Sequence, residues 1–135
     1  MSHTTAWTRK SLIWTVEGVL TSSEIVDFLE EMADSPLFEK IEYLIWNTLA
    51  VTDYVMDSDD AQLSSLYTGS LEMYNKKLIA ALVITNPTVL EFAGLLLEAM
   101  TGRNSEWVVA VHPDMHKAQD WLDSMAPGYL IETGV

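Results

Sequence analysis

Short apolar runs alternate with segments of helical spacing along most of this chain. Each run is rich in β-branched or aromatic residues, and each is followed by a stretch in which apolar residues recur every three or four positions. The runs are Leu12–Val16, Tyr43–Trp46, Leu78–Ile84 and Trp107–Val111. Strands that alternate with helices form a mainly parallel sheet, because a parallel connection needs a crossover long enough to hold a helix. The pattern therefore predicts an α/β fold with a mostly parallel, mixed sheet of four or five strands.

Polar residues between these runs indicate where two of the helices begin. Thr21 to Glu24 reads as a capping box, with Thr21 as N-cap and Glu24 reaching back towards it. Asn86 and Pro87 have the residue types preferred at the cap and first position of a helix. These signals predict one helix before Pro36 and another from Thr88 to about Thr101.

The strand boundaries are less sharply marked than the helix starts. We expect Gly18 to end the first strand and residues 47–56 to be the least regular segment. Leu78–Ile84 is the most apolar run and is predicted to lie at the centre of the sheet. Ala6–Arg9 is a candidate edge strand. The residues expected in the core are Ile45, Leu82, Val83, Leu96 and Val109.

The second long helix is predicted to open at the acidic segment Asp57–Asp60, because acidic residues stabilise the positive end of a helix dipole. Its apolar spacing predicts one inward stripe along the helix. The residues of that stripe are Leu63, Leu66, Tyr67, Ser70, Met73 and Tyr74.

The helix over residues 88–101 is apolar around most of its circumference. A helix that packs on a sheet needs only about a third of its circumference buried, so the surplus predicts a second contact surface. The residues of this expected apolar surface are Leu90, Leu97, Met100, Tyr129 and Leu130. Because a two-fold dimer is the commonest closed assembly, we expect a homodimer.

Composition and charge limit the class of partner. The chain has 135 residues, which we interpret as a single domain over 1–135 with a core of about 11–125, a short N-terminal arm and a C-terminal tail. Its formal net charge is −13, which repels nucleic acid and anionic lipid surfaces. It has no cysteine, and we expect no signal peptide and no membrane insertion. These features favour a cytoplasmic protein that binds basic or apolar protein surfaces, or a small neutral ligand.

No catalytic motif is found on this frame. Gly-rich phosphate loops and Gly-x-Ser-x-Gly turns are absent from the sequence. His112 and His116 have a spacing compatible with metal ligands, but Pro113 marks a helix start between them, so we favour a structural role. We therefore expect no metal site, no cofactor and no enzymatic activity.

Three tryptophans, Trp14, Trp46 and Trp107, lie in predicted strands or at a strand start. Aromatic side chains pack well on a pleated surface, so we expect them in the core. A cage around a ligand is the alternative.

Several local patterns together resemble the SpoIIAA-like branch of the STAS fold, the domain of anti-sigma-factor antagonists, which is also described as STAS/SEC14-like. The matching segments are Val16–Leu20 followed by Thr21–Glu24, then Ala80 to Val83 with the apolar helix after it, and Met115–Leu122. The resemblance covers about Leu12 to Met125. It implies a small sheet of four or five strands with about four helices, packed mainly on one side.

The resemblance also implies a regulatory site at Ser58. In the sigma-antagonist members, a serine within Asp-Ser-x-Gly at the start of the second helix is phosphorylated by a partner kinase. Here the matching segment reads Asp57-Ser58-Asp59-Asp60, so Asp60 stands in the glycine position. Two adjacent carboxylates oppose the added phosphate. The alternative is that Ser58 or Asp57 simply caps the helix.

Two functional hypotheses from different classes remain. The first is a non-enzymatic protein-interaction or regulatory module of the STAS-like type. The second is a small-molecule or lipid-binding domain of the SEC14-like type, with an apolar pocket formed by the tryptophans and the helix over 88–101. A cavity beside that helix would favour the ligand-binding hypothesis. A second subunit covering the helix would favour the protein-interaction hypothesis.

Overall fold

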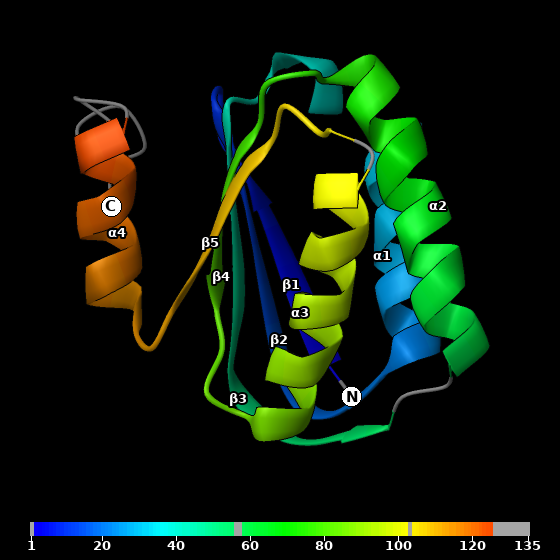
Figure 1. Ribbon diagram of the computed structural model, residues 1–135. Helices are drawn as coiled ribbons and strands as arrows, with labels where there is room; N and C mark the ends of the chain where they lie inside the picture. Colours follow the sequence, from blue (N-terminus) through cyan, green and yellow to red (C-terminus); the bar gives the residue numbers. More distant parts are fainter. Residues whose placement is uncertain (1, 56–57, 103, 126–135) are drawn as a thin grey trace.

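The computed structural model of the protein describes residues 2–55, 58–102 and 104–125 and contains a five-stranded sheet (Figure 1). The strands lie in the order β1-β2-β3-β4-β5. β1 pairs antiparallel with β2, and all the other neighbours are parallel. The predicted α/β fold with a mixed, mostly parallel sheet is confirmed. The strands are β1 (Ser2–Trp7), β2 (Ser11–Thr21), β3 (Tyr43–Val55), β4 (Ile79–Val83) and β5 (Val108–His112).

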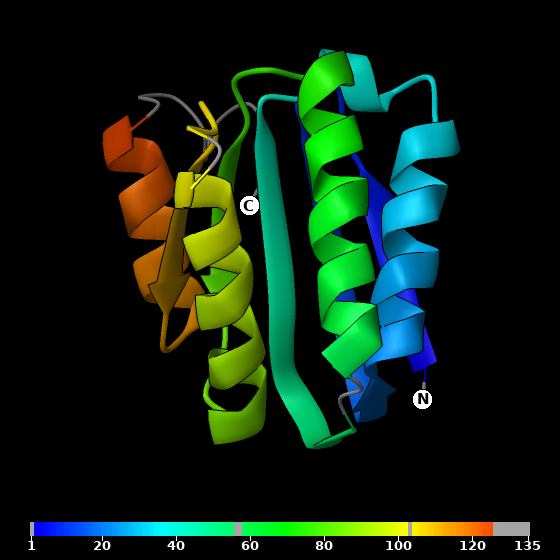
Figure 2. The ribbon, with the colours of Figure 1, turned by 45° about the vertical axis from the view of Figure 1, so that its right-hand side comes forward.

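The described residues also form four α-helices and a short 3₁₀ helix, η1. α1, α2 and α3 cover one face of the sheet, and α4 lies alone on the opposite face (Figures 1 and 2). In the described part of the chain, none of the helices is long and apolar enough to cross a membrane. The helices are α1 (Ser22–Asp34), η1 (Phe38–Lys40), α2 (Ser58–Tyr74), α3 (Pro87–Gly102) and α4 (Met115–Met125).

The connectivity explains why three helices share one face. β2, β3, β4 and β5 are parallel and adjacent in chain order, so each connection crosses over in the same direction. Such crossovers are almost always right-handed, and three right-handed crossovers in one direction place their helices on the same side. α4 follows the last strand, is not a crossover, and is therefore free to cover the other face.

The first part of β3, Tyr43–Trp46, and nearly all of β4 are buried on both faces, as their continuous apolar runs predict. Leu44, Trp46, Ala80 and Leu82 belong to the core under α1, α2 and α3. Their alternating neighbours face α4 and form a second core there; these are Tyr43, Ile45, Ala81 and Val83. The two-residue period of the strands thus divides one apolar run between two cores.

Of the predicted core residues, Ile45, Leu82 and Val83 are buried. Leu96 and Val109 are partly buried and pack against the core beneath α1, α2 and α3. Leu96 and Val109 keep some exposure because α3 and β5 lie at one edge of the domain, where fewer elements cover them (Figure 2).

Two strand-boundary predictions are wrong. Gly18 does not end β2, and residues 47–55 are not irregular, because β2 and β3 pair on to Thr21 and Val55. The register shifts twice on the way, between Thr15 and Glu17 and between Gly18 and Val19. Gly18 has a φ of 79°, a conformation that glycine adopts at little cost, so it carries the strand through an irregular step.

The strand at the middle of the sheet is not the one that the sequence predicts. β4 is an interior strand, but the middle position belongs to β3, which at 13 residues is the longest strand. The candidate edge strand exists and covers Ser2–Trp7 rather than Ala6–Arg9. Both differences arise because the position of a strand in the sheet depends on which distant strands it pairs with. The residues of a single apolar run do not encode that pairing.

The predicted helix starts are confirmed. Thr21 Oγ1 accepts from the backbone N–H of Glu24 at 3.3 Å and donates to Glu24 Oε1 at 2.8 Å. Glu24 therefore reaches back to the cap hydroxyl. Asn86 Oδ1 accepts from the backbone N–H groups of Thr88 at 2.9 Å and Val89 at 3.2 Å. Each cap fixes where the chain leaves the sheet and turns over it.

His112, at the end of β5, packs against Trp121 of α4 with ring centroids 5.0 Å apart. Its Nε2 is buried and has no hydrogen-bond partner among the described residues. Burial lowers the pKa of His112 below its ordinary value of 6.5, and Asp114 partly opposes this shift. The folded state therefore favours the neutral form of the His112 ring.

We predict that the free energy of unfolding decreases as the pH falls below 6.5, because the unfolded chain takes up this proton before the folded chain does. H112F keeps a ring against Trp121 and should remove this part of the pH dependence. The measurement is urea unfolding between about pH 7.5 and 5.5. H116F is the control, because His116 is exposed and lies 3.3 Å from Asp120. An equal slope in the wild type and H112F would contradict the prediction.

Candidate functional site

α2 turns to solvent several apolar residues that the sequence analysis expected to face inward. Its buried described residues include Ser64, Thr68 and Leu71. Leu66 and Met73, which were expected on the inward stripe, are 70% and 77% exposed, and Tyr74 is 58% exposed. The inward-stripe prediction is therefore wrong for these three residues and for Ser70, which is also exposed. Tyr67 is half-buried and packs against the core, and the side chain of Leu63 lies outside the described part of the structure. The helix presents an apolar outer face, defined here as Leu66, Met73 and Tyr74.

Hydrogen bonds between distant segments hold the C-terminal end of α2 in this orientation. Asn75 is buried directly after the helix, and its Nδ2 donates to the carbonyls of Phe38 at 2.9 Å and Ile41 at 2.8 Å. Its own carbonyl accepts from Trp107 Nε1 at 2.6 Å. These contacts attach the end of α2 to the segment before β3 and to the start of β5, so the helix cannot turn its apolar face inward without breaking them.

A hydrogen bond also links the middle of α2 to α1. Tyr67 donates its hydroxyl to Glu30 Oε1 at 2.5 Å. This hydrogen bond to the carboxylate raises the pKa of Tyr67 above its ordinary value of 10.0, with further contributions from desolvation and from the charges of Glu30 and Asp27. The phenol therefore remains protonated and keeps donating at neutral pH.

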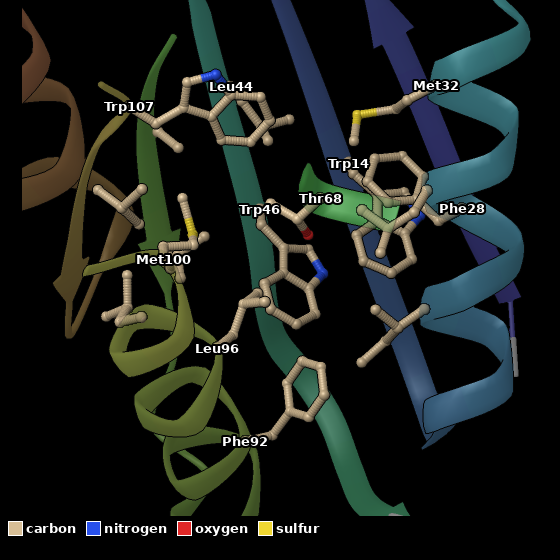
Figure 3. Close-up of a pocket in the computed structure, with 16 residues that line it drawn as sticks. Trp14, Phe28, Met32, Leu44, Trp46, Thr68, Phe92, Leu96, Met100 and Trp107 are labelled. Carbon is tan, nitrogen blue, oxygen red and sulfur yellow. The ribbon is translucent and has the colours of Figure 1, made fainter. Parts of the chain in front are cut away.

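Beneath α2, a partly enclosed apolar pocket lies between the sheet, α1 and α3, with about 60 Å³ of free space. In Figure 3, side chains from the strands, from α1 on one side and from α3 on the other converge on this space. The lining is apolar apart from the hydroxyl of Thr68 and the indole N–H groups, and it includes no charged side chain. Thr68 donates to the backbone carbonyl of Ser64 at 2.8 Å.

Aromatic rings form the wall on the side of β2 and β3. Trp14 stacks on Phe28 with a centroid distance of 3.9 Å, and on Trp46 at 5.3 Å, with nearly parallel planes in both pairs. All three of the tryptophans singled out from the sequence line the pocket, because Trp107 closes the side next to β5. The expectation that these residues lie in the core is confirmed, since Trp14 and Trp46 are buried and Trp107 is partly buried against the same core. The ligand cage stays a prediction.

The indole N–H groups of these tryptophans differ in their bonding. Trp107 Nε1 donates to Asn75, as described above. The Nε1 atoms of Trp14 and Trp46 are buried, and neither has a hydrogen-bond partner among the described residues. A buried donor without a partner costs about 1–3 kcal/mol. Such groups are rare in natural proteins, so each needs an explanation.

A second, more polar hollow adjoins the apolar pocket. It has about 120 Å³ of free space and shares Leu97, Met100, Trp107 and Val109 with the first pocket. Its other lining residues are Thr101 and Ser105. Ser105 donates its hydroxyl to Glu72 in a short hydrogen bond. The two hollows together run from the aromatic stack to the C-terminal end of α3.

The structure separates the residues of the predicted apolar surface. Leu90 is exposed on α3, whereas Leu97 is half-buried and Met100 is buried, and both line the pocket. Tyr129 and Leu130 lie outside the described residues. The surplus apolar side of α3 is therefore used in part by a cavity within this chain.

Ser58 is the first residue of α2, at the start of the second α-helix. Its side chain lies outside the described part of the structure, as do Asp57 and the side chains of Asp59 and Asp60. Among the described residues, no group of three or more His, Cys, Asp or Glu side chains could hold a metal ion.

Sequence reasoning missed two features of this site. It did not identify the two unpartnered indole donors, and it placed the apolar face of α2 inward. A signal for the second feature existed, because Ser64 and Thr68 are spaced by four with Leu71 and Asn75 following on the same side. That stripe of small and polar residues has the helical period as clearly as the apolar one.

No family profile and no curated protein matches the sequence. The solved structures that are similar to this one include two of SpoIIAA. The anti-sigma factor antagonist SpoIIAA in its unphosphorylated form is 17% identical, with a TM-score of 0.56, over 91% of this chain and 97% of that one. The Bacillus cell fate determinant SpoIIAA in the phosphorylated form is 17% identical, with a TM-score of 0.51, over 90% and 99% of the respective chains. The chain is therefore a domain with the SpoIIAA-like fold, as the sequence resemblance predicted.

Proposed function

We propose that this chain is a non-enzymatic regulatory module that acts by binding another protein through the apolar outer face of α2. The observation that carries the proposal is the exposure of Leu66 and Met73, at 70% and 77%. These residues are seven apart and therefore lie on one side of the helix, with Tyr74 beside them. A surface helix normally turns such residues inward, so an outward apolar face is typical of a contact surface.

The charge of the chain indicates the chemistry of the partner. The net charge of −13 favours association with basic surfaces and speeds the encounter with them. The outer face of α2 itself offers apolar and aromatic contacts. The partner that fits both features has an apolar groove surrounded by basic residues, into which a helix can lie.

We predict that L66S/M73S loses its protein partner while keeping its fold. Because both side chains are exposed, the change in the free energy of unfolding should be within about 0.5 kcal/mol. Wild-type and variant chains immobilised at equal density would be exposed to extract from the source cells, and the retained proteins compared by quantitative mass spectrometry. Proteins that bind the wild type should then be purified and their affinities measured, with a loss of at least about tenfold expected for the variant.

V108S/V111S is the matched control for this experiment. Val108 and Val111 are also exposed apolar residues, but they lie on β5, at the far edge of the sheet from α1 and α2 (Figure 1). This control should retain the same proteins as the wild type. Equal loss in both variants, or equal retention by L66S/M73S, would contradict a docking role for α2.

Ser58 is the position at which we propose that this interaction is regulated. A phosphate there adds a charge of about −1.5 to −2 at the N-terminus of the docking helix. The helix dipole favours this charge by roughly 0.3–1 kcal/mol, while Asp59 and Asp60 oppose it.

We predict phosphate on Ser58 in protein isolated from its source cells, none in S58A, and a higher occupancy in D60G, which removes one opposing carboxylate. Phosphopeptide mass spectrometry provides the measurement. Absence of phosphate from both the wild type and D60G would leave only a capping role, in which S58A costs about 1 kcal/mol of stability.

Self-association is the remaining part of the proposal. Leu90 and Leu95 are exposed on α3, away from the pocket-facing side of that helix. At physiological salt, repulsion between like-charged subunits is screened beyond about 8 Å, so an apolar contact there can exceed it.

We predict a homodimer at micromolar concentration and a monomer for L90S/L95S. Sedimentation equilibrium measures both. L66S/M73S is the control and should remain dimeric. A monomeric wild type would contradict the prediction without affecting the proposed role of α2.

A further inference from the structure

We propose that β5 pairs antiparallel with β5 of a second copy of this chain, so that the two sheets join edge to edge across a two-fold axis at Ala110. The inference rests on the self-association proposed above and deepens it, because it names the strand, the register and the backbone groups that join the copies. It does not involve the outer face of α2.

β5 is an edge strand without the usual protection of such edges. In the described part of the chain it pairs with β4 on one side and with no strand on the other. Natural proteins protect exposed edges with charged residues, prolines, bulges or a covering element. β5 reads Val-Val-Ala-Val-His, and its register with β4 is regular. The buried residues of α4, Ala118 and Leu122, pack with residues of β3 and β4, so this helix lies mainly over the neighbouring strands.

The exposed side chains of β5 lie on both faces of the sheet. Val108 is in register with Ile79 on the α4 side, and Val111 is in register with Leu82 on the side of α3. They are 41% and 37% exposed. A partner that rests on one face of the sheet covers one of them, whereas a strand added at the edge contacts both.

The backbone of β5 offers hydrogen bonds to such a strand. The N–H of Val108 donates to the carbonyl of Leu78 at 3.0 Å, and the carbonyl of His112 accepts from the N–H of Ile84 at 3.1 Å. Backbone groups of successive residues alternate between the two sides of a strand. The N–H and C=O groups of Val109 and Val111 therefore point away from β4.

The neighbours of these two residues select one register. The N–H of Trp107 already donates to Ser105 Oγ at 3.2 Å, and Pro113 has no N–H. An antiparallel ladder that uses both valines places Val109 opposite Val111 of the second copy, and such a pair exchanges both of its hydrogen bonds. Ala110 then faces its own copy on the axis. The strand is thus complementary to itself, as a two-fold interface requires.

Charge and the neighbouring helix are compatible with a second copy as the occupant. Each copy has a net charge of −13, but β5 contains no acidic or basic residue other than His112. α3 lies at the same edge of the domain and exposes Leu90 and Leu95 (Figure 2). Glu106 and Asp114 flank the strand and face each other across the two copies in this register, so their repulsion weakens the dimer at low salt.

A single introduced cysteine tests the register, because the chain has no cysteine of its own. A110C is expected to form a disulfide between two copies under mild oxidation, since paired Cα atoms at the axis lie about 4.5 Å apart. V111C is the matched control and is the more exposed position. Its two copies lie roughly 8 Å apart in this register, beyond the reach of a disulfide. Non-reducing electrophoresis at equal concentration should show at least about fivefold more cross-linked A110C.

Two further measurements test the backbone hydrogen bonds. V111P removes an N–H that points away from β4 and should weaken the dimer at least about tenfold by sedimentation equilibrium. V111T keeps this N–H and the branched side chain and should dimerise as the wild type does. In the wild type, amide hydrogen exchange at Val109 and Val111 should slow as the concentration rises through the dimer range, while exchange in β1, the other edge strand, stays constant.

A wild-type dimer in which A110C and V111C cross-link equally, or in which the amides of Val109 and Val111 exchange at a constant rate, would overturn edge pairing and leave self-association standing. A monomeric wild type would overturn both. The cross-linking and exchange results remain decisive if V111P fails to fold. L66S/M73S should pair through β5 as the wild type does, so a failure of this edge and a failure of the docking face of α2 give different results.

Discussion

The handedness of the three β-α-β crossovers is the constraint on which the rest of the structure depends. Because β2 to β5 are parallel and follow one another across the sheet, right-handed connections place α1, α2 and α3 on a single face. That face must then be covered by three helices packed side by side (Figure 2). The opposite face receives only α4, and its core is correspondingly smaller.

α2 buries small and polar residues and exposes apolar ones. Trp14 and Trp46 project from the sheet on this side and already occupy much of the space beneath the helices. The small residues Ser64 and Thr68 are buried on the inner side of α2, together with Leu71. The apolar residues Leu66 and Met73 are then left on the solvent side. One helix thus forms both the roof of the pocket and the exposed face proposed for docking.

A shared fold at 17% identity rests on pattern and connectivity more than on individual residues. The strand–helix order and the mixed sheet are features that such a pattern retains. The aromatic stack of Trp14, Phe28 and Trp46, and the acidic residues that follow Ser58, are described here as properties of this chain.

The sequence alone determined those features that local periodicity and capping encode. It predicted the α/β class, the four main strands and the caps at Thr21 and Asn86, because each signal lies within a few neighbouring residues. Only the tertiary structure decided the features that depend on distant contacts. Pairing with β2 turned residues 47–55 into strand, and bonds from Asn75 to Phe38 and Ile41 fixed the end of α2. The convergence of Trp14, Trp46 and Met100 on one pocket has the same origin. Periodicity shows that two faces of an element differ, but burial is decided by whichever segment covers a face.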